Sequence, residues 1–284
     1  MTRTREITDD MAAEIAGADR DFIDVVQRLP RGENEYLPSN WLRIEALERN
    51  QVLGHASVEL GMNVLEVGCG AHAISTIALA HRVGDRGRVV AVEKERWTYF
   101  DEIVRASGLA KRVIPLTCDA TNLPFPHESF DLAVSVHSVR SFRDEDTIVG
   151  IFREMLRVAQ RIFVAESLPI ARNAAQAAHL EMYNLRQEIF ESVLGSRDDL
   201  HYFPLDQLAG FVERAGGRVT GSRTFDSNMP HYLAFIPRKY VERVESQAGR
   251  EDLLRRWDAA YTKLIEDGEE HLPVGLVDGV RRQV

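Results

Sequence analysis

The stretch Val64-Leu65-Glu66-Val67-Gly68-Cys69-Gly70-Ala71-His72 decides the fold class of this chain. Its first four residues are apolar apart from Glu66, as in a parallel strand that is buried on both faces. The glycines let the backbone turn sharply and let a ligand approach it closely. The apolar run from Ala73 to Ala80 predicts a helix, whose free N–H groups form a positive dipole end. This pattern predicts a nucleotide-type pocket, although a strand–turn–helix without a ligand has the same spacing.

The composition is that of an ordinary globular protein and limits the classes of partner. Hydrophobic residues make up 44% of the 284 residues, and the net charge is -9. Because a phosphate backbone would be repelled by this charge, we expect no nucleic acid as the main substrate. Two cysteines, Cys69 and Cys118, form neither a disulfide framework nor a paired metal motif. We therefore expect a reducing, cytoplasmic setting and no bound metal.

No segment of the sequence predicts export or membrane insertion. The basic start from Met1 to Glu6 is not followed by the apolar core of a signal peptide. No apolar run reaches the ~18 residues that a membrane span needs. The sequence therefore predicts a chain without a membrane span.

Helices are expected before the glycine stretch. Apolar residues recur at helical intervals over 8–29, and Ser39 or Asn40 can cap a helix from Trp41 through Leu60. We assign residues 1–60 to a helical cap over the pocket. Simple packing of these helices against the edge of the sheet is the alternative.

Strands and helices alternate from Asn63 onward. Strands are expected at 64–67, 88–92, 113–117, 130–136 and 161–166, with helices at 75–83, 97–106 and 147–158. Such alternation implies right-handed crossovers and a parallel sheet with helices on both faces. The fold class is therefore α/β.

The alternation ends after Pro169. A helical insert is expected over about 171–203, followed by a helix at 205–215 and strands at 218–225 and 232–236. The short link between these two strands cannot hold a crossover, so they are expected to form an antiparallel hairpin. We divide the chain into the cap, a sheet domain over 61–238 with this insert, and a charged helical extension over 239–284.

Three acidic residues fall at expected strand ends. Glu66 ends the first strand, Glu93 the second, and Asp119 follows the third. In an open parallel sheet the ligand lies beyond the carboxyl ends of the strands. A carboxylate at the second strand can accept both ribose hydroxyls, and one at the third can accept from an exocyclic amine.

These motifs resemble those of class I S-adenosylmethionine-dependent methyltransferases. The resemblance is carried by Glu66-Val67-Gly68-Cys69-Gly70, Glu93, Cys118-Asp119-Ala120-Thr121-Asn122-Leu123-Pro124-Phe125 and Phe130-Asp131-Leu132-Ala133-Val134. It covers 63–236 and implies a seven-stranded Rossmann-like sheet that is mostly parallel and has a C-terminal antiparallel hairpin. The segment 119–142 is similar to the ubiquinone/menaquinone C-methyltransferase branch, in which Arg140 falls on an arginine that those enzymes have.

The resemblance implies S-adenosylmethionine as the cofactor and assigns roles to residues. Glu93 would hold the ribose hydroxyls, and Asp119 with the Ala120 N–H would bind adenine. His72 stands where the family often has a third glycine, and it would either donate to the cofactor's carboxylate or face solvent. The full expected cofactor set is Glu66, Gly68, Cys69, Gly70, His72, Glu93, Lys94, Asp119, Ala120, Ser135 and Val136.

Methyl transfer to a hydroxyl or an acidic carbon needs a general base. We expect His137, directly after the fourth strand, in this role, with Arg140 and Tyr183 as further catalytic residues. Arg140 would hold an acidic substrate or pair with Asp144 or Glu145. The other candidate bases are His72, Glu181, His201 and His231.

The expected function is methyl transfer to a small organic molecule, with the insert as a substrate lid and a homodimer as one possible assembly. The acceptor atom, O, N or C, stays open. The glycine spacing also fits an NAD(P)-dependent oxidoreductase, and a methyltransferase-like fold without catalysis, used as a binding or scaffold subunit, is the third alternative.

Overall fold

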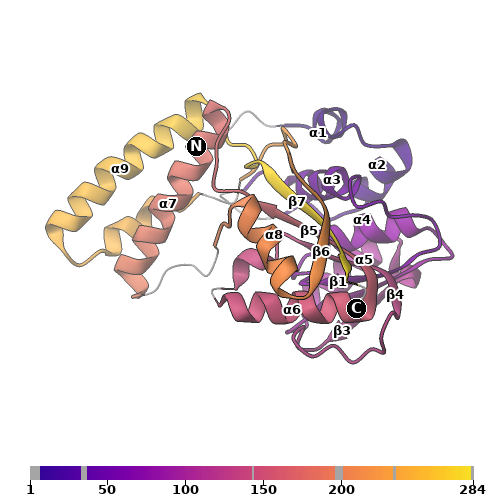
Figure 1. The fold of residues 1–284 in the computed structure, drawn as a ribbon. Helices are drawn as coiled ribbons and strands as arrows, with labels where there is room; N and C mark the ends of the chain where they lie inside the picture. The colour runs from indigo at the N-terminus through magenta and orange to yellow at the C-terminus, as the bar shows by residue number, and fades with distance from the viewer. Residues whose placement is uncertain (1–6, 33–36, 143, 196–200, 233–234, 283–284) are drawn as a thin grey trace.

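In the residues that the structure describes, one seven-stranded sheet organises the fold (Figure 1). The computed structural model describes residues 7–32, 37–142, 144–195, 201–232 and 235–282. The strand order is β3-β2-β1-β4-β5-β7-β6, with β1 to β5 parallel and β7 antiparallel to both of its neighbours. The strands are β1 (Asn63–Val67), β2 (Arg88–Glu93), β3 (Val113–Thr117), β4 (Phe130–Val136), β5 (Ala159–Ser167), β6 (Gly217–Phe225) and β7 (Val274–Arg281). The expected fold class is therefore confirmed.

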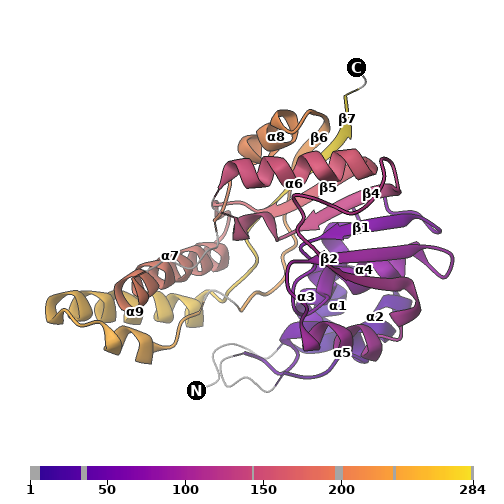
Figure 2. The ribbon, with the colours of Figure 1, turned by 90° about the horizontal axis from the view of Figure 1, so that it is seen from below.

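Helices cover both faces of the sheet (Figure 2). On one face, apolar side chains of five helices share a core with the strands: α1 (Asp9–Ala16), α2 (Arg20–Gln27), α3 (Trp41–Leu53), α4 (Ile74–Val83) and α5 (Thr98–Ala106). On the other face, α6 (Glu145–Val158) and α8 (Leu205–Arg214) pack over a second core. Apolar periodicity on each helix places these side chains against the sheet.

The helix that was expected over 8–29 is two helices. Gly17 ends α1 in the left-handed conformation, with φ 57°, and Asp19 caps α2 by accepting a hydrogen bond from the Phe22 N–H. The next helix, expected to reach Leu60, ends at Leu53. In both cases the apolar periodicity continues past the end of the helix. Local capping and turn geometry end the helix there, and the periodicity does not reveal this.

The expected hairpin of 218–225 with 232–236 is wrong in its second strand. Residues 232, 235 and 236 form no strand, and residues 233–234 lie outside the described residues. The partner of β6 is instead β7, near the C-terminus, which lies between β5 and β6. The helical extension expected over 239–284 thus ends in a strand of the central sheet.

The insert and the extension form one helical subdomain beside the sheet (Figures 1 and 2). It contains α7 (Ala174–Leu194), the 3-10 helix η3 (Arg238–Arg243) and α9 (Gln247–Glu266), packed around Met182, Ile189 and Trp257. Residues 196–200 of the expected insert lie outside the described residues. Within the described part of the chain, no helix has both the length and the apolar character needed to cross a membrane.

Candidate active site

The glycine turn after β1 has the backbone that a closely bound ligand needs. Gly68 and Gly70 have φ values of 76° and 66°, which favour glycine. A Cβ at Gly68 would lie 2.5 Å from the Cβ of Ser138, whereas a Cβ at Gly70 would meet nothing within 4 Å. Gly68 thus lets the turn pack against the segment after β4, and open space remains beside Gly70.

The expected ribose carboxylate is fixed directly to this turn. Glu93 Oε2 accepts the Gly70 N–H at 3.0 Å, and Oε1 accepts the Lys94 N–H at 2.9 Å. Each carboxylate oxygen has a further lone pair for a ligand hydroxyl. The Lys94 side chain itself is exposed.

Asp119 lies exposed beyond β3, which is the next strand along. Its Oδ1 accepts both the N–H and the hydroxyl of Thr121, at 2.8 and 2.7 Å, and these bonds lower the pKa of Asp119. Among the described residues, none donates a hydrogen bond to Oδ2. The acceptor expected for an adenine amine is therefore ionised and accessible.

Glu66 has a structural position in this site. Its side chain is buried and accepts the hydroxyls of Ser75 and Thr76 at 2.5 Å each, which ties the first turn of α4 to β1. Burial, with the nearby Glu93 charge, raises the pKa of Glu66 to about 7. The expected direct contact of Glu66 with the cofactor stays a prediction.

His72 lies between two aromatic rings. Its imidazole meets the edge of Trp41 from α3 at 5.2 Å between ring centroids, and it stacks on Tyr99 of α5 at 5.8 Å. The half-buried position lowers the pKa of His72. The side chain that replaces the family's third glycine thus joins α3 to α5 beside the turn.

The residues of this edge fit an adenosyl cofactor. A hollow between the ends of β2 and β3 is lined by Cys69, Gly70, Glu93, Trp97 and Leu116. At about 20 Å³ it is too small for a purine, so the fit to the cofactor rests on the Glu93 carboxylate and on the open space beside Gly70. Burial raises the pKa of the Cys69 thiol, which makes Cys69 a packing residue.

The opposite side of the glycine turn faces the end of β4. Ser135 and Val136 are buried, and Ser135 Oγ lies 2.6 Å from Ser138 Oγ, which also donates to the Val67 carbonyl. Ser138, which the sequence patterns did not identify, therefore connects β1 with β4.

His137 is buried at the end of β4 and has a left-handed backbone, with φ 51°. Its Nδ1 lies 3.2 Å from Ser167 Oγ and 3.4 Å from Glu166 Oε1, and its Nε2 lies 3.7 Å from Glu48 Oε1. Among the described residues, Nε2 has no hydrogen-bond partner. Burial would raise the pKa of Glu166, but Arg140 and then His137 hold it below its usual value.

Arg140 pairs with Glu166 and with neither of the two partners expected from the sequence. The Arg140 N–H donates to Glu166 Oε2 at 3.0 Å, and its Nε lies 3.6 Å from Oε1. Asp144 instead caps α6, and Glu145 pairs with Arg214. The expectation of an Arg140–Asp144 or Arg140–Glu145 pair is wrong because Asp144 accepts from the first N–H groups of α6 and Glu145 contacts Arg214 and Gln207 of α8.

The other candidate catalytic residues lie at different distances from the His137 and Arg140 cluster. Tyr183 is buried in α7 against the ring of Tyr202, 4.5 Å between centroids, and both tyrosines lie near Arg140. The backbone N–H of His201 donates to the Arg140 carbonyl at 2.6 Å. Glu181 is a partly exposed partner of Lys263 and lies outside this cluster.

Sequence patterns missed much of the polar cluster around His137. α3 contributes Glu45, Glu48 and Arg49, all buried, and later segments contribute His179, Glu269 and His271 beside the candidate base His231. Burial by itself would raise the pKa of Glu48. The Arg49 charge, with His271 and His137, instead holds this pKa well below its usual range. The available signal was the i, i+3, i+4 spacing of charged residues on one face of α3.

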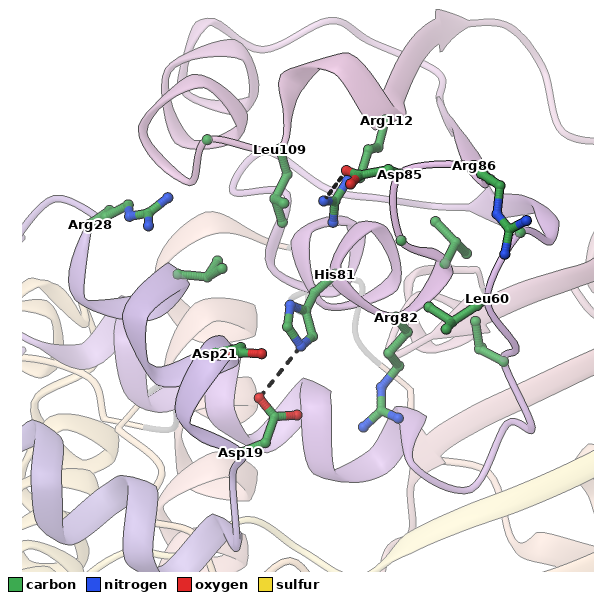
Figure 3. Close-up of a pocket in the computed structure, with 16 residues that line it drawn as sticks. Asp19, Asp21, Arg28, Leu60, His81, Arg82, Asp85, Arg86, Leu109 and Arg112 are labelled. Carbon is green, nitrogen blue, oxygen red and sulfur yellow. Dashed lines mark hydrogen bonds and ion pairs between the residues drawn. The ribbon is translucent and has the colours of Figure 1, made fainter.

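A separate hollow of about 820 Å³ lies at the other end of α4 (Figure 3). His81, in the last turn of α4, lies 3.5 Å from Asp19, and Arg112 lies 2.5 Å from Asp85. Its lining includes none of the expected site residues. The glycine turn precedes α4, whose ten residues span about 15 Å, so this hollow is remote from the turn.

Known proteins are similar to part of the chain. Residues 64–162 match the methyltransferase domain family. The ajmaline N-methyltransferase of Rauvolfia serpentina is 29% identical over 97 residues, 34% of this chain and 32% of that protein. The ubiquinone/menaquinone biosynthesis C-methyltransferase UbiE of Idiomarina loihiensis is 24% identical over 162 residues, 56% of this chain and 64% of that protein. The matches span about a third to just under two thirds of these relatives.

The fold is also similar to a solved structure. A cyclopropane-fatty-acyl-phospholipid synthase-like protein from Lactobacillus casei has a TM-score of 0.66 at 16% identity, covering 90% of this chain and 97% of that one. At this identity the likeness concerns the fold alone. The matched domain contains the glycine turn and Glu93, so this part of the chain is similar to S-adenosylmethionine-dependent methyltransferases, whose cofactor is S-adenosylmethionine.

Proposed function

We propose that the chain transfers the methyl group of S-adenosylmethionine to a small organic molecule held against the end of β4. One observation carries this proposal. The glycine turn, Glu93 and His137 follow or end three neighbouring strands, β1, β2 and β4, at one carboxyl edge of the sheet. A cofactor held by the glycine turn would thus lie between the Glu93 carboxylate, which binds its ribose, and the buried imidazole of His137.

When bound, the cofactor supplies an electrophilic methyl group on its sulfonium, so the protein mainly aligns the acceptor and excludes water. His137 is the proposed general base. Its Nδ1 faces Glu166, which orients the ring, and its Nε2 lacks a hydrogen-bond partner among the described residues. Nε2 is therefore the atom that takes the acceptor's proton.

Arg140 and Tyr183 have supporting roles in this proposal. Arg140 fixes the Glu166 carboxylate and thereby the tautomer of His137, so it is a positioning residue. Tyr183 and Tyr202 form an aromatic wall beside Arg140 on the side of α7. Burial, opposed by the charge of Arg140, raises the pKa of Tyr202 to about 12, which keeps its hydroxyl protonated.

The buried imidazole favours an acceptor that must lose a proton. The relatives named above include an N-methyltransferase and a C-methyltransferase, so their names leave the acceptor atom open. An uncharged amine needs no base, whereas a hydroxyl or an acidic carbon does. We therefore favour an O–H or an acidic C–H acceptor.

Calorimetry with S-adenosylmethionine and with NAD tests the cofactor assignment. We expect saturable binding of S-adenosylmethionine at one site and no binding of NAD. Binding of NAD alone would support an oxidoreductase, and binding of neither would support a scaffold. Catalysis is then tested by incubating the protein with S-adenosylmethionine and panels of hydroxyl, acidic-carbon and amine acceptors and measuring S-adenosylhomocysteine. Turnover confined to amines would overturn the preference for an acceptor that loses a proton.

His137→Gln separates a base from a structural residue. We expect at least a tenfold lower turnover with an unchanged S-adenosylmethionine dissociation constant, because His137 contacts the acceptor side of the site. His127→Gln, at an exposed histidine, is the matched control. Equal loss of cofactor binding and turnover would contradict the proposed role.

We also propose roles for the N-terminal helices and the insert, and a form of the protein in solution. Residues 1–60 act as a cap, since Trp41 of α3 contacts His72 beside the glycine turn. The insert over about 171–203 acts as a substrate lid together with α9. A cytoplasmic homodimer is the proposed form of the protein, and light scattering on purified protein measures its mass in solution.

A further inference from the structure

Two histidines and a glutamate from distant parts of the chain converge beside the proposed base. Nδ1 of His231 lies 2.8 Å from Oε1 of Glu45, and Nε2 of His271 lies 3.2 Å from the same oxygen. The three potential ligand atoms lie within 4.8 Å of one another. All three side chains are at least 93% buried, and the rings of His271 and His137 are 6.4 Å apart.

The backbone holds the two histidines in register. The His231 N–H donates to the Glu269 carbonyl, and the His271 N–H donates to the Met229 carbonyl, both at 3.0 Å. These bonds flank the antiparallel bridge between Pro230 and Glu270. The two imidazole rings, 4.0 Å apart between centroids, are therefore presented to Glu45 by a short paired element.

One nitrogen of this trio lacks a hydrogen bond. Among the described residues, Nε2 of His271 has no hydrogen-bond partner, although it lies 3.2 Å from Glu45 Oε1, whereas Glu45 Oε2 is paired with Nη2 of Arg49 at 3.2 Å. A buried polar atom without a hydrogen bond costs about 1–3 kcal/mol. A cation bound by this nitrogen and by Glu45 Oε1 would satisfy the nitrogen.

We propose that Glu45, His231 and His271 bind a divalent transition-metal ion, with zinc as the first choice. Two imidazole nitrogens and one carboxylate oxygen are ligands that zinc accepts, whereas magnesium and calcium prefer oxygen alone. Ligands at zinc–ligand distances of about 2.0–2.1 Å lie roughly 3.3 Å apart in a tetrahedral site. From Glu45 Oε1, the separation to His271 Nε2 is 3.2 Å, which matches this value, and the separation to His231 Nδ1 is 2.8 Å, which is shorter. This assignment replaces the expectation of no metal drawn from the cysteines.

Neighbouring side chains support the proposed ligands. Nδ1 of His179 lies 3.1 Å from Glu269 Oε1, and the His179 ring lies 4.8 Å from that of His231. Arg49 orients the carboxylate of Glu45. Such outer contacts fix the orientation of metal ligands. The bound ion would join α3 to the two segments that lead to and from the helical subdomain.

The test uses full-length, tag-free protein. Elemental analysis after dialysis should find one equivalent of zinc per chain, and chelation should remove it and lower the melting temperature. Calorimetry of the chelated protein with zinc should give one site. Cobalt should give visible bands of a low-symmetry nitrogen–oxygen site.

Variants decide whether these three residues hold the ion. Glu45→Gln and His271→Gln should each weaken zinc binding at least tenfold, whereas the control His127→Gln, at an exposed histidine, should bind like the wild type. Absence of stoichiometric binding by the wild type, or unchanged binding by both variants, would overturn the proposal. The wild-type measurement stays decisive if either variant fails to fold. Cofactor binding is measured separately, so failure of the proposed methyl transfer is distinguishable.

Discussion

At the residue scale, Glu93, the proposed ribose carboxylate, is expected to determine how tightly the adenosyl cofactor is held. Its carboxylate is positioned by the N–H groups of Gly70 and Lys94. Hydrogen bonds to a charged group contribute about 1.5–3 kcal/mol, which corresponds to about 10- to 150-fold in affinity. Glu93→Ala should therefore raise the S-adenosylmethionine dissociation constant by at least tenfold in calorimetry. Glu102→Ala, an exposed change on α5, should leave it unchanged. Equal affinities of the two variants would contradict the assignment.

Glu66 makes stability depend on pH in a defined direction. Its pKa in the folded protein is about 7, against 4.5 as the reference value for the unfolded chain. Because the folded pKa is raised, the stabilisation is complete below about pH 4.5 and is lost as the pH rises through 7. Glu66→Gln mimics the protonated group, so it should increase the free energy of unfolding at pH 8 by about 1–3 kcal/mol and change it little at pH 5.

Urea unfolding of the cofactor-free protein at both pH values checks this expectation. Glu59→Gln, at an exposed position, should have no effect at either pH. An effect of equal size at pH 5 and pH 8 would show that titration of Glu66 is not its origin.

At the scale of elements, β7 depends on close packing against α8. A Cβ on Gly279 would lie 2.8 Å from Val212 Cγ1 and 3.2 Å from Ile162 Cγ1. Gly279→Ala should therefore destabilise the protein by about 1–3 kcal/mol through overpacking. Gly210→Ala is the matched control on α8, where a Cβ meets nothing within 4 Å, and should stabilise by about 0.5–1 kcal/mol. Thermal unfolding measures both, and destabilisation by both variants would contradict the packing argument.

At the scale of the whole molecule, the helical subdomain has its own core and is expected to loosen separately from the sheet. Trp257 is 6% exposed, donates from Nε1 to the Ile236 carbonyl at 2.8 Å and stacks on Tyr261. Trp257→Ala should cost about 3–5 kcal/mol. Hydrogen exchange should then rise in α7 and α9 first, with cofactor affinity within about twofold of the wild type.

Leu194→Ala provides the control for this change, because Leu194 is 58% exposed at the end of α7. It should leave hydrogen exchange in α9 unchanged. Exchange that rises equally in the central strands of the Trp257 variant would show that the subdomain and the sheet unfold as one unit.

The sequence alone determined the local framework of the cofactor site. The apolar strand Val64–Val67, the two glycines and Glu93 are close in the chain, and their positions follow from strand burial, turn geometry and strand-end placement. The parallel half of the sheet could be predicted for the same reason, because its strands and crossover helices follow one another. The turn residue His72 was identified, but its contacts with Trp41 and Tyr99 were not.

Only the tertiary structure decided which distant segments meet. β7 pairs with β5 and β6 although more than forty residues separate it from β6, and Gly275 and Gly279 weaken its strand pattern. Glu45, His231 and His271 come together from three segments. In the sequence, a buried charged residue on a helix, such as Glu45, cannot be distinguished from a solvent-exposed one. The periodicity of apolar residues indicates which face of one helix or strand is buried. The pairing of strands that are distant in the chain depends instead on how the complete surfaces of the packed elements fit together.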